Sequence, residues 1–241
     1  YDLRFYLAFR DIQEKVSKTT QDNELRVMRS FWQTLTTEEI LEKDITKKIN
    51  KIKTPKKVKK PFTEYEVEML RKEVAKHQQG KKYLAIIDVL SSTGCRIGEL
   101  VAMNRNDLEG DKIIIKGKGN KERYVYLNAR ALFSVNDYLK SRDDAYDAMF
   151  VGYNIHTKEI TERITAGAVE SYIRRCGKHV GIKKAHPHRF RRTTATLALR
   201  RGMPIEQVGR MLGHEQLSTT QIYAKSDESD IARAHEMYLG S

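Results

Sequence analysis

The chain has 241 residues, and 45 Lys and Arg residues stand against 32 Asp and Glu residues, which gives a formal net charge of +13. Hydrophobic residues make up 39% of the sequence, near the norm for globular proteins, so the composition argues against disorder. The apolar stretches are interrupted well before the roughly 18 residues of a membrane span, and the two cysteines, Cys95 and Cys176, form no disulfide framework. A soluble protein with a strong basic excess is therefore predicted. The chain begins at Tyr1 without an initiator methionine or a signal-peptide pattern, and we expect it to start inside a longer protein.

Residues 1–52 are predicted to form a small helical domain, because apolar residues recur every three or four positions around residues 3–9 and 25–35. Residues 53–61 contain two prolines and little to bury, which is typical of a linker between domains. Lysines along an extended chain can follow a phosphate backbone and release counterions. A solvated linker without a partner is an equally open interpretation.

Residues 62–241 are predicted to form the second domain. Thr63 and Glu66 have the spacing of a capping box, which marks a helix start. An apolar helix follows from Lys81 to Ser92 and is expected to end at Thr93-Gly94. Two β-rich runs, 112–116 and 122–127, are joined by the turn sequence GKGN and predict a hairpin. Further helices are expected at 96–103, 129–142, 165–180, 188–201, 204–212 and 226–239. The predicted fold class is mainly α with a small β-hairpin, an α+β arrangement.

Five short segments of this second domain contain side chains suited to handling a phosphodiester. They are Arg96 in TGCRIGEL, Lys118 in GKGNKER, His188 and Arg191 in HPHRFRR, His214 in LGH, and Tyr223 in STTQIY. Taken singly, each has an ordinary structural explanation: Arg96 can pair with Glu99, and Lys118 can be a solvated hairpin tip. Their order and spacing along the chain carry more information than any one of them.

In this order and spacing the chain resembles the tyrosine recombinase (phage integrase) family, including Xer-type enzymes. That family carries an arginine, a hairpin lysine, a His-x-x-Arg motif, a His or Trp after Leu-Gly, and a tyrosine nine residues later. All six positions are filled here. The resemblance is strong over residues 62–241, which it implies form the catalytic domain. Residues 1–52 more weakly resemble the latter part of the family's helical core-binding domain, whose beginning we expect to be missing.

The resemblance implies that Arg96, Arg191 and His214 bind the phosphate. Attack on a DNA phosphate builds negative charge on the non-bridging oxygens, and planar, permanently charged arginine forks suit these oxygens. His214 can donate a further hydrogen bond there. Glu99 lies one helical turn from Arg96, where it either orients the guanidinium or forms an ordinary helical ion pair.

The resemblance further implies that Tyr223 is the nucleophile, His188 its base and Lys118 the acid. A phenol with a pKa of about 10 needs a proton acceptor at neutral pH. The departing 5′ oxygen needs a proton, which a flexible ammonium at a hairpin tip can deliver. Lys121 is the rival donor in the same hairpin, although a backbone contact is the favoured prediction for it.

Basic residues outside the catalytic set are predicted to contact DNA. They are Lys53, Lys56, Lys57, Lys59, Lys60, Lys121, Arg189 and Arg192. Two of them depart from the family pattern. Arg192 stands where many relatives carry histidine, and Arg189 stands where an apolar or small residue is usual. These departures leave the six-residue set untouched.

No metal ion or cofactor is expected. Metal-assisted phosphoryl chemistry asks for clustered carboxylates or His/Cys sets, and the sequence spacing reveals none. His186 and His188 are only two positions apart, and His214-Glu215 is too short a motif to specify zinc. The GKGNK segment lacks the positions of a nucleotide phosphate-binding loop.

The predicted function is that of a site-specific DNA recombinase or integrase acting through a 3′-phosphotyrosyl intermediate and a Holliday junction. One alternative is a type IB topoisomerase. Another is a non-catalytic regulator, because residues 196–202 followed by 205–212 have helix-turn-helix character. The expected partners are a double-stranded recombination site and further copies forming a homo-tetramer, or a related recombinase as a hetero-partner. The expected location is the nucleoid in the cytoplasm of a prokaryotic cell.

Residues 226–239 combine an acidic start with apolar residues at three- and four-residue spacing, which predicts an amphipathic C-terminal helix. By itself the apolar stripe favours packing on its own domain. The family resemblance implies instead that this helix docks on a neighbouring protomer.

Overall fold

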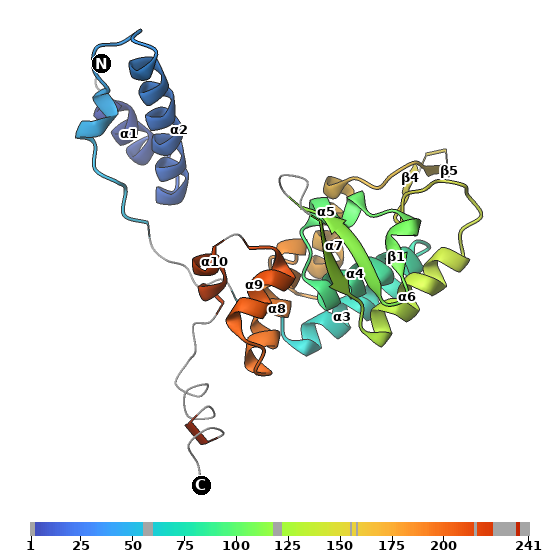
Figure 1. The fold of residues 1–241 in the computed structure, drawn as a ribbon. Coiled ribbons are helices and arrows are strands. Elements are labelled where there is room, and N and C mark those ends of the chain that lie inside the picture. The colour runs from blue at the N-terminus through green and yellow to red at the C-terminus, as the bar shows by residue number, and fades with distance from the viewer. Residues whose placement is uncertain are drawn as a thin grey trace. The chain divides into compact units, whose positions relative to one another are not determined.

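The structure is a computed structural model of the chain, and it divides into two compact units, Tyr1–Lys59 and Lys60–Ser241 (Figure 1). The boundary falls inside the segment predicted as a linker. The described residues are 3–54, 60–117, 122–154, 156–157, 159–214, 216–223 and 235–236. The central linker residues, the hairpin tip with Lys118 and Lys121, and nearly all of the predicted helix 226–239 lie outside them. Of the helices described, none combines the length and the apolar character that crossing a bilayer requires.

The first unit is helical, as predicted. Helix α1 spans Leu3–Ile12 and α2 spans Lys18–Thr37, followed by the 3-10 helix η1 at Ile45–Lys48. The Ser17 hydroxyl accepts a hydrogen bond from the Thr20 amide at 3.2 Å and so caps the start of α2. Leu25 of α2 is fully buried in the contact with α1 and η1. This small unit therefore has a core of its own.

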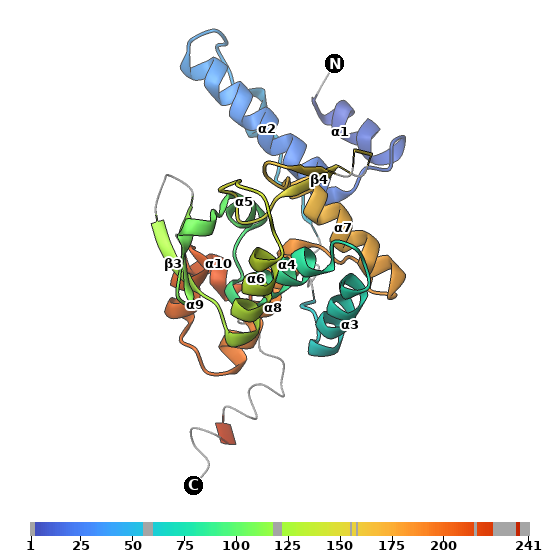
Figure 2. The same ribbon diagram turned by 90° about the vertical axis from the view of Figure 1, so that its right-hand side faces the viewer.

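The second unit is a helical assembly around α4, which spans Gly80–Thr93. The other helices are α3 (Glu64–Ala75), α5 (Ile97–Ala102), α6 (Ala129–Lys140), α7 (Ala166–His179), α8 (Pro187–Arg200), α9 (Ile205–Leu212) and α10 (Leu217–Gln221). Helix α4 contacts α3, α6 and α8, and its residues Ile86, Ile87 and Leu90 are fully buried (Figure 2). An apolar helix at the centre explains why the sequence shows so long an apolar run there.

Two small antiparallel sheets complete this unit. Strands β1 (Leu108–Glu109), β2 (Lys112–Lys116) and β3 (Glu122–Tyr126) form the first, in that order, and β4 (Gly152–Asn154) pairs with β5 (Glu159–Thr161). The β2–β3 pairing confirms the predicted hairpin. Ile113 of β2 lies opposite Val125 of β3, and both side chains are buried in the core. Strands β1, β4 and β5, helix α10 and the 3-10 helix η2 at Arg105–Asp107 were not predicted from the sequence.

Several helix boundaries follow the sequence signals. Thr63 and Glu66 form both hydrogen bonds of the capping box at the start of α3. Gly94 adopts a left-handed conformation, with φ of 62°, and ends α4, as Gly213 with φ of 67° ends α9. The mainly helical fold with a small hairpin is confirmed.

The chain entering the second unit is fastened to α8. The Phe62 amide donates to the Thr193 hydroxyl at 2.8 Å, and the Phe62 ring packs on that of Phe190. Arg189 of the same helix pairs with Glu66 at 2.8 Å, and its guanidinium lies 4.0 Å from the centre of the Phe62 ring. Residues at the end of the linker thus have fixed partners on α8.

Candidate active site

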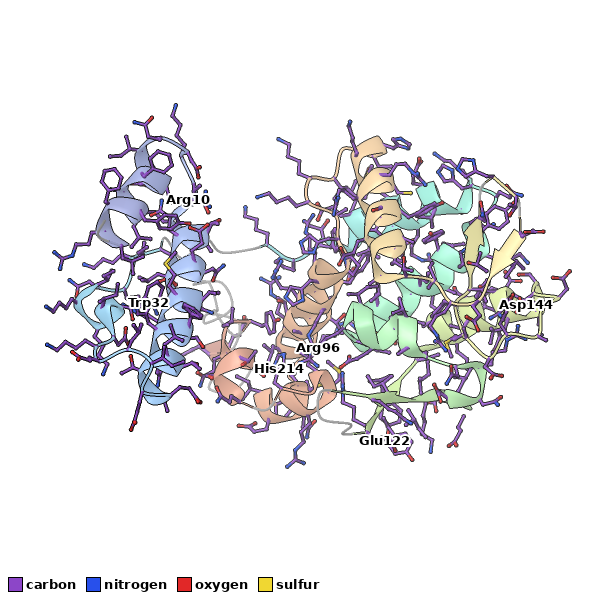
Figure 3. The ribbon with its side chains drawn as sticks, turned by 90° about the horizontal axis from the view of Figure 1, so that it is seen from above. Arg10, Trp32, Arg96, Glu122, Asp144 and His214 are labelled. Atoms are coloured by element: carbon purple, nitrogen blue, oxygen red, sulfur yellow. The ribbon has the colours of Figure 1, made fainter. Side chains whose placement is uncertain are left out.

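Five of the six predicted catalytic residues lie within the described part of the chain. Arg96 precedes α5, His188 and Arg191 lie on α8, His214 follows α9, and Tyr223 follows α10. Figure 3 shows Arg96 and His214 next to each other. The placement of Lys118, the sixth, lies outside the described residues.

Arg191 is almost completely buried, with 1% of its surface exposed. Its guanidinium donates to the carbonyl of Gly94 at 2.9 Å and to that of Leu212 at 2.7 Å. Burial lowers the pKa of Arg191 to about 10, with a smaller contribution from the positive charge of Arg96. The side chain stays charged at neutral pH in a fixed orientation.

Arg96 is the exposed partner of Arg191. Its guanidinium donates to Glu99 at 2.9 Å and to the carbonyl of Gly213 at 3.1 Å, while 45% of the side chain is exposed. We refer to Arg96 and Arg191 as the arginine pair. Two like charges close together attract an anion, and a phosphate with two non-bridging oxygens fits this pair.

Each arginine of the pair donates to the carbonyl of a glycine that ends a helix. Gly94 ends α4 and Gly213 ends α9, and both have positive φ values that favour glycine. A Cβ atom on Gly94 would lie 2.9 Å from the Leu212 side chain. Helix C-termini carry partial negative charge, which favours a bound cation. The backbone therefore offsets part of the repulsion between the two guanidinium groups.

Glu99 is buried and connects Arg96 to Arg123 of β3. Arg123 donates to both carboxylate oxygens, at 2.9 and 2.8 Å, and to the carbonyl of Met211 at 3.2 Å. The Arg96 amide donates to Glu99 as well, at 2.8 Å. Burial would raise the pKa of Glu99, but the hydrogen bonds from Arg123 and Arg96 outweigh it, so the pKa lies below its ordinary value. Glu99 is therefore ionised and held on both sides.

His214 is oriented by Thr220 of α10. Its Nδ1 lies 2.8 Å from the hydroxyl of Thr220, which is fully buried. Burial, together with the positive charges of Arg191 and Arg96, lowers the pKa of His214 to about 4. The imidazole is thus neutral at pH 7. When the Thr220 hydroxyl donates to Nδ1, the ring proton sits on Nε2 and is available for donation.

Tyr223 is half-buried beside these groups. Its amide donates to the Thr220 carbonyl at 2.9 Å, and its ring centre lies 6.1 Å from that of His214. The side chain packs against the small apolar cluster of Ala195, Val208 and Leu212. The short helix α10 thereby sets the positions of both His214 and Tyr223.

His188 lies in the first turn of α8, one turn before Arg191, and is exposed. Pro187 occupies the first position of the helix, where a missing amide proton has no cost. His188 is near enough to His214 for its charge to lower the pKa of that residue. The role of His188 as a base stays a prediction.

The predicted DNA contacts fall into three groups. Lys53 and Lys60 are exposed, whereas Lys56, Lys57, Lys59 and Lys121 lie outside the described residues. Arg189 is engaged by Glu66 and by the carbonyls of residues 60, 61 and 183. Arg192 is mostly buried and donates to the Lys60 carbonyl at 3.4 Å. A contact of Arg189 or Arg192 with DNA stays a prediction.

Two supporting residues, Arg123 and Thr220, were not predicted from the sequence. Arg123 lies in the segment GKGNKER, which drew attention only to its lysines. A period of two along β3 would have placed Arg123 on the face opposite Tyr124, but not beside Glu99. Thr220 carries no local signal, because its partner His214 is brought to it by the unanticipated helix α10.

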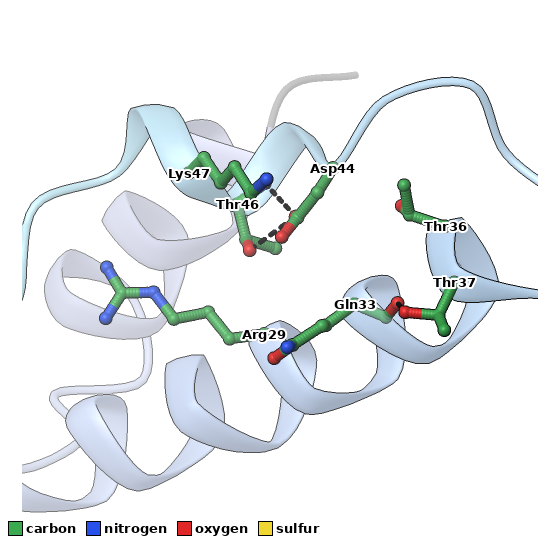
Figure 4. Close-up of a pocket in the computed structure, with 7 residues that line it drawn as sticks. All are labelled: Arg29, Gln33, Thr36, Thr37, Asp44, Thr46 and Lys47. Carbon is green, nitrogen blue, oxygen red and sulfur yellow. Dashed lines mark hydrogen bonds between the residues drawn. The ribbon is translucent and has the colours of Figure 1, made fainter.

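The first unit has a pocket of about 490 Å³ (Figure 4). Its lining consists of Arg29, Gln33, Thr36, Thr37, Asp44, Thr46 and Lys47. The Asp44 carboxylate accepts from the amide and the hydroxyl of Thr46, at 2.8 and 2.6 Å, and so caps η1. Of the predicted site residues that the structure describes, none lines this pocket.

Comparison with known proteins agrees with the geometry. Residues 60–230 match the phage integrase family. The tyrosine recombinase XerC of Leptospira interrogans is 32% identical over 241 aligned residues, which cover 97% of this chain and 76% of the relative. XerC of Lactobacillus leichmannii is 32% identical over 236 residues, covering 92% and 76%. The chain therefore spans about three quarters of the length of these relatives.

Solved structures have the same fold. The crystal structure of XerA recombinase has a TM-score of 0.65 at 27% identity and covers 98% of this chain and 81% of XerA. XerH recombinase, solved in a post-cleavage complex with a palindromic difH substrate, has a TM-score of 0.77 at 20% identity, with coverage of 99% and 73%.

The chain belongs to the phage integrase family. Within that family it is a tyrosine recombinase, as its relatives and the described part of the site agree.

Proposed function

We propose that this recombinase cuts and rejoins DNA strands at a specific site through a 3′-phosphotyrosyl intermediate and a Holliday junction, without metal or ATP. The observation that carries the proposal is the arginine pair. Arg191 is buried and fixed by two carbonyls, Arg96 is exposed and fixed by Glu99 and Gly213, and His214 lies beside both. Donors arranged before the substrate arrives stabilise developing charge without a reorganisation cost.

In this proposal the scissile phosphate lies on the arginine pair. Arg96, Arg191 and neutral His214 donate to its non-bridging oxygens, where negative charge grows in the transition state. Thr220 acts as a positioning residue, since its hydroxyl leaves the Nε2 proton of His214 for the phosphate.

Tyr223 attacks the phosphorus and forms the bond to the 3′ phosphate, while the 5′ oxygen leaves. His188 takes the phenolic proton, and Lys118 gives a proton to the leaving oxygen. Rejoining is the reverse, with a 5′ hydroxyl of another strand attacking the phosphotyrosyl bond. Because the energy of the broken bond is kept in that link, no nucleotide cofactor is required.

DNA is the proposed partner. Support comes from the net charge of +13 and from fold neighbours such as XerH bound to difH and the Tn1549 transposon integrase bound to circular intermediate DNA. We further propose a homo-tetramer on the site, or assembly with a related recombinase, in the nucleoid of a prokaryotic cell. The XerC relatives do not favour a topoisomerase or a non-catalytic regulator.

A nicked suicide substrate tests the proposal. DNA spanning the junctions of the source genome is incubated with the chain, and a denaturing gel is examined for a protein–DNA adduct. Wild type should form the adduct, and Tyr223→Phe should form none while binding DNA with nearly unchanged affinity. Tyr153→Phe, which removes a tyrosine of strand β4, serves as the control and should retain the adduct. An adduct in Tyr223→Phe would overturn the assignment.

A further inference from the structure

Three metal-ligating side chains meet between α3 and α7. Glu73 lies in the last turn of α3, His77 follows two residues after the end of that helix, and His179 is the last residue of α7. Among the residues that the structure describes, one potential ligand atom from each of these three lies within 4.8 Å of the other two. The group could not be predicted from the sequence, because His179 is 106 residues from Glu73.

The distances suit a small divalent cation. Oε1 of Glu73 lies 3.2 Å from Nδ1 of His179 and 3.5 Å from Nε2 of His77. Bonds of about 2.0–2.2 Å to zinc in tetrahedral arrangement place neighbouring ligand atoms about 3.3–3.6 Å apart. One of the two separations lies in this range and the other is about 0.1 Å shorter, and rotation of the imidazoles can adjust the third.

The surroundings orient the ligands. Lys76 donates to Oε2 of Glu73 at 3.0 Å, which leaves Oε1 facing the two imidazoles. Only 11% of the Glu73 side chain is exposed, and the ring of His77 packs edge-on against that of Tyr172, with 5.9 Å between ring centres. Outer hydrogen bonds and packing of this kind fix the direction in which a ligand atom points.

We propose that Glu73, His77 and His179 bind a zinc-type divalent cation that joins α3 to α7. Two imidazoles and one carboxylate are a ligand set that zinc accepts, with water completing the tetrahedron. Helices α3 and α7 lie on the opposite side of the second unit from β3 and α10 (Figure 2). The cation has a structural role there and takes no part in the transfer of DNA strands.

Titration of the full, untagged chain with Zn²⁺ and with Co²⁺ tests the site. Calorimetry should show one tight binding site for the cation. Bound Co²⁺ should show the visible absorption that is typical of a cobalt ion with few ligands. His77→Ala should lose this site. His179→Gln is the sharper variant, because an amide can still donate to Glu73 but is a poor zinc ligand. His156→Ala, which removes an exposed histidine between β4 and β5, is the matched control and should bind as wild type does.

Thermal unfolding gives an independent readout. Zinc at 100 times its Kd should raise the Tm of the wild type by about 5–10 °C. The same addition should leave the Tm of His179→Gln unchanged. Equal metal binding in wild type and both site variants, or absence of a one-to-one site in the wild type, would overturn the proposal. If the variants lower the Tm relative to wild type by the same amount with and without zinc, the three side chains form only a hydrogen-bonded cluster and the proposal is wrong.

Cleavage separates this site from the proposed chemistry. No proposed catalytic residue is among the three ligands, so cleavage in EDTA should match cleavage in magnesium within a few-fold. Loss of cleavage in EDTA that only a divalent cation restores would contradict the metal-free mechanism, while leaving the binding data on Glu73, His77 and His179 standing.

Discussion

Arg123 and Glu99 form a two-pronged ion pair between the β-hairpin and the helix that Arg96 precedes. Since Glu99 also accepts from the side chain and the amide of Arg96, the pair sets where that guanidinium points. Arg123 additionally donates to the carbonyl of Met211, three residues before His214. One side chain thus connects the strand after the hairpin tip, the exposed member of the arginine pair and the end of α9.

Arg123→Lys should slow strand cleavage while leaving DNA affinity nearly unchanged. A lysine keeps the charge but cannot bond both oxygens of Glu99 together with Met211. Misplacement of a phosphate-binding group by about 1 Å can cost up to about 100-fold in rate, so we expect a loss of about 10- to 100-fold. Single-turnover cleavage of a suicide substrate measures it.

Arg105→Lys is the control for this prediction. Arg105 forms an ion pair with Asp144, with 2.9 Å between nitrogen and oxygen, and neither residue belongs to the candidate site. It should lower stability without slowing cleavage. Glu99→Gln combined with Arg123→Lys should be little worse than either change alone, since residues that act as a unit are not additive. Additive losses would mean that the two side chains act separately.

Lys118→Ala should cleave ordinary DNA slowly but recover on a substrate whose bridging 5′ oxygen is replaced by sulfur. A thiolate departs without a proton, so the acid becomes unnecessary. Arg96→Ala should show no such recovery, because the non-bridging oxygens still need their charge stabilised. If Lys118→Ala fails equally on both substrates, Lys118 has a positioning role instead, or Lys121 is the acid.

Stability should fall as the pH is lowered from 6.5 toward 4, in part because of His214. Its pKa in the folded chain is about 4, against an ordinary value of 6.5. Between these values the unfolded chain binds a proton that the folded chain refuses, so acid favours unfolding. In His214→Gln the side chain at this position cannot bind a proton in this pH range. The change in urea midpoint between pH of about 7 and about 5 should therefore be smaller in this variant than in wild type. His156→Gln should behave as wild type.

Deletion of residues 227–241 should leave binding to a single site intact, weaken synapsis and change the cleavage rate. The acidic start and apolar spacing of this segment predict an amphipathic helix, and Tyr223 precedes it by only a few residues. Native gels measure assembly, and product formation measures recombination. Unchanged assembly and recombination in the truncated chain would reject docking on a neighbouring protomer.

The helices and the hairpin could be predicted because their signals are local. The capping box at Thr63, the glycine after Thr93 and the alternation along 112–116 each act within a few residues. Strands β4 and β5 were missed because each has only three residues, and their pairing depends on the surrounding fold. Helix α10 has five residues, too few for a periodic pattern.

The candidate site could be predicted only in part. The order of six residues could be recognised from a family pattern, but their supports could not, because these depend on contacts across long stretches of chain. Arg191 reaches Gly94 across 97 residues, and Arg96 reaches Gly213 across 117. The sequence also left open whether Glu99 orients Arg96. The buried position of Glu99 between two arginines supports the orienting role.

Residues 60–62 are fastened to α8, the helix that bears His188 and Arg191. The Phe62–Thr193 hydrogen bond holds the start of the second unit against this helix. A shift of α8 moves both side chains together relative to a bound phosphate, and reaction geometry tolerates little error. The contacts of residues 60–62 with α8 therefore help to hold His188 and Arg191 in place.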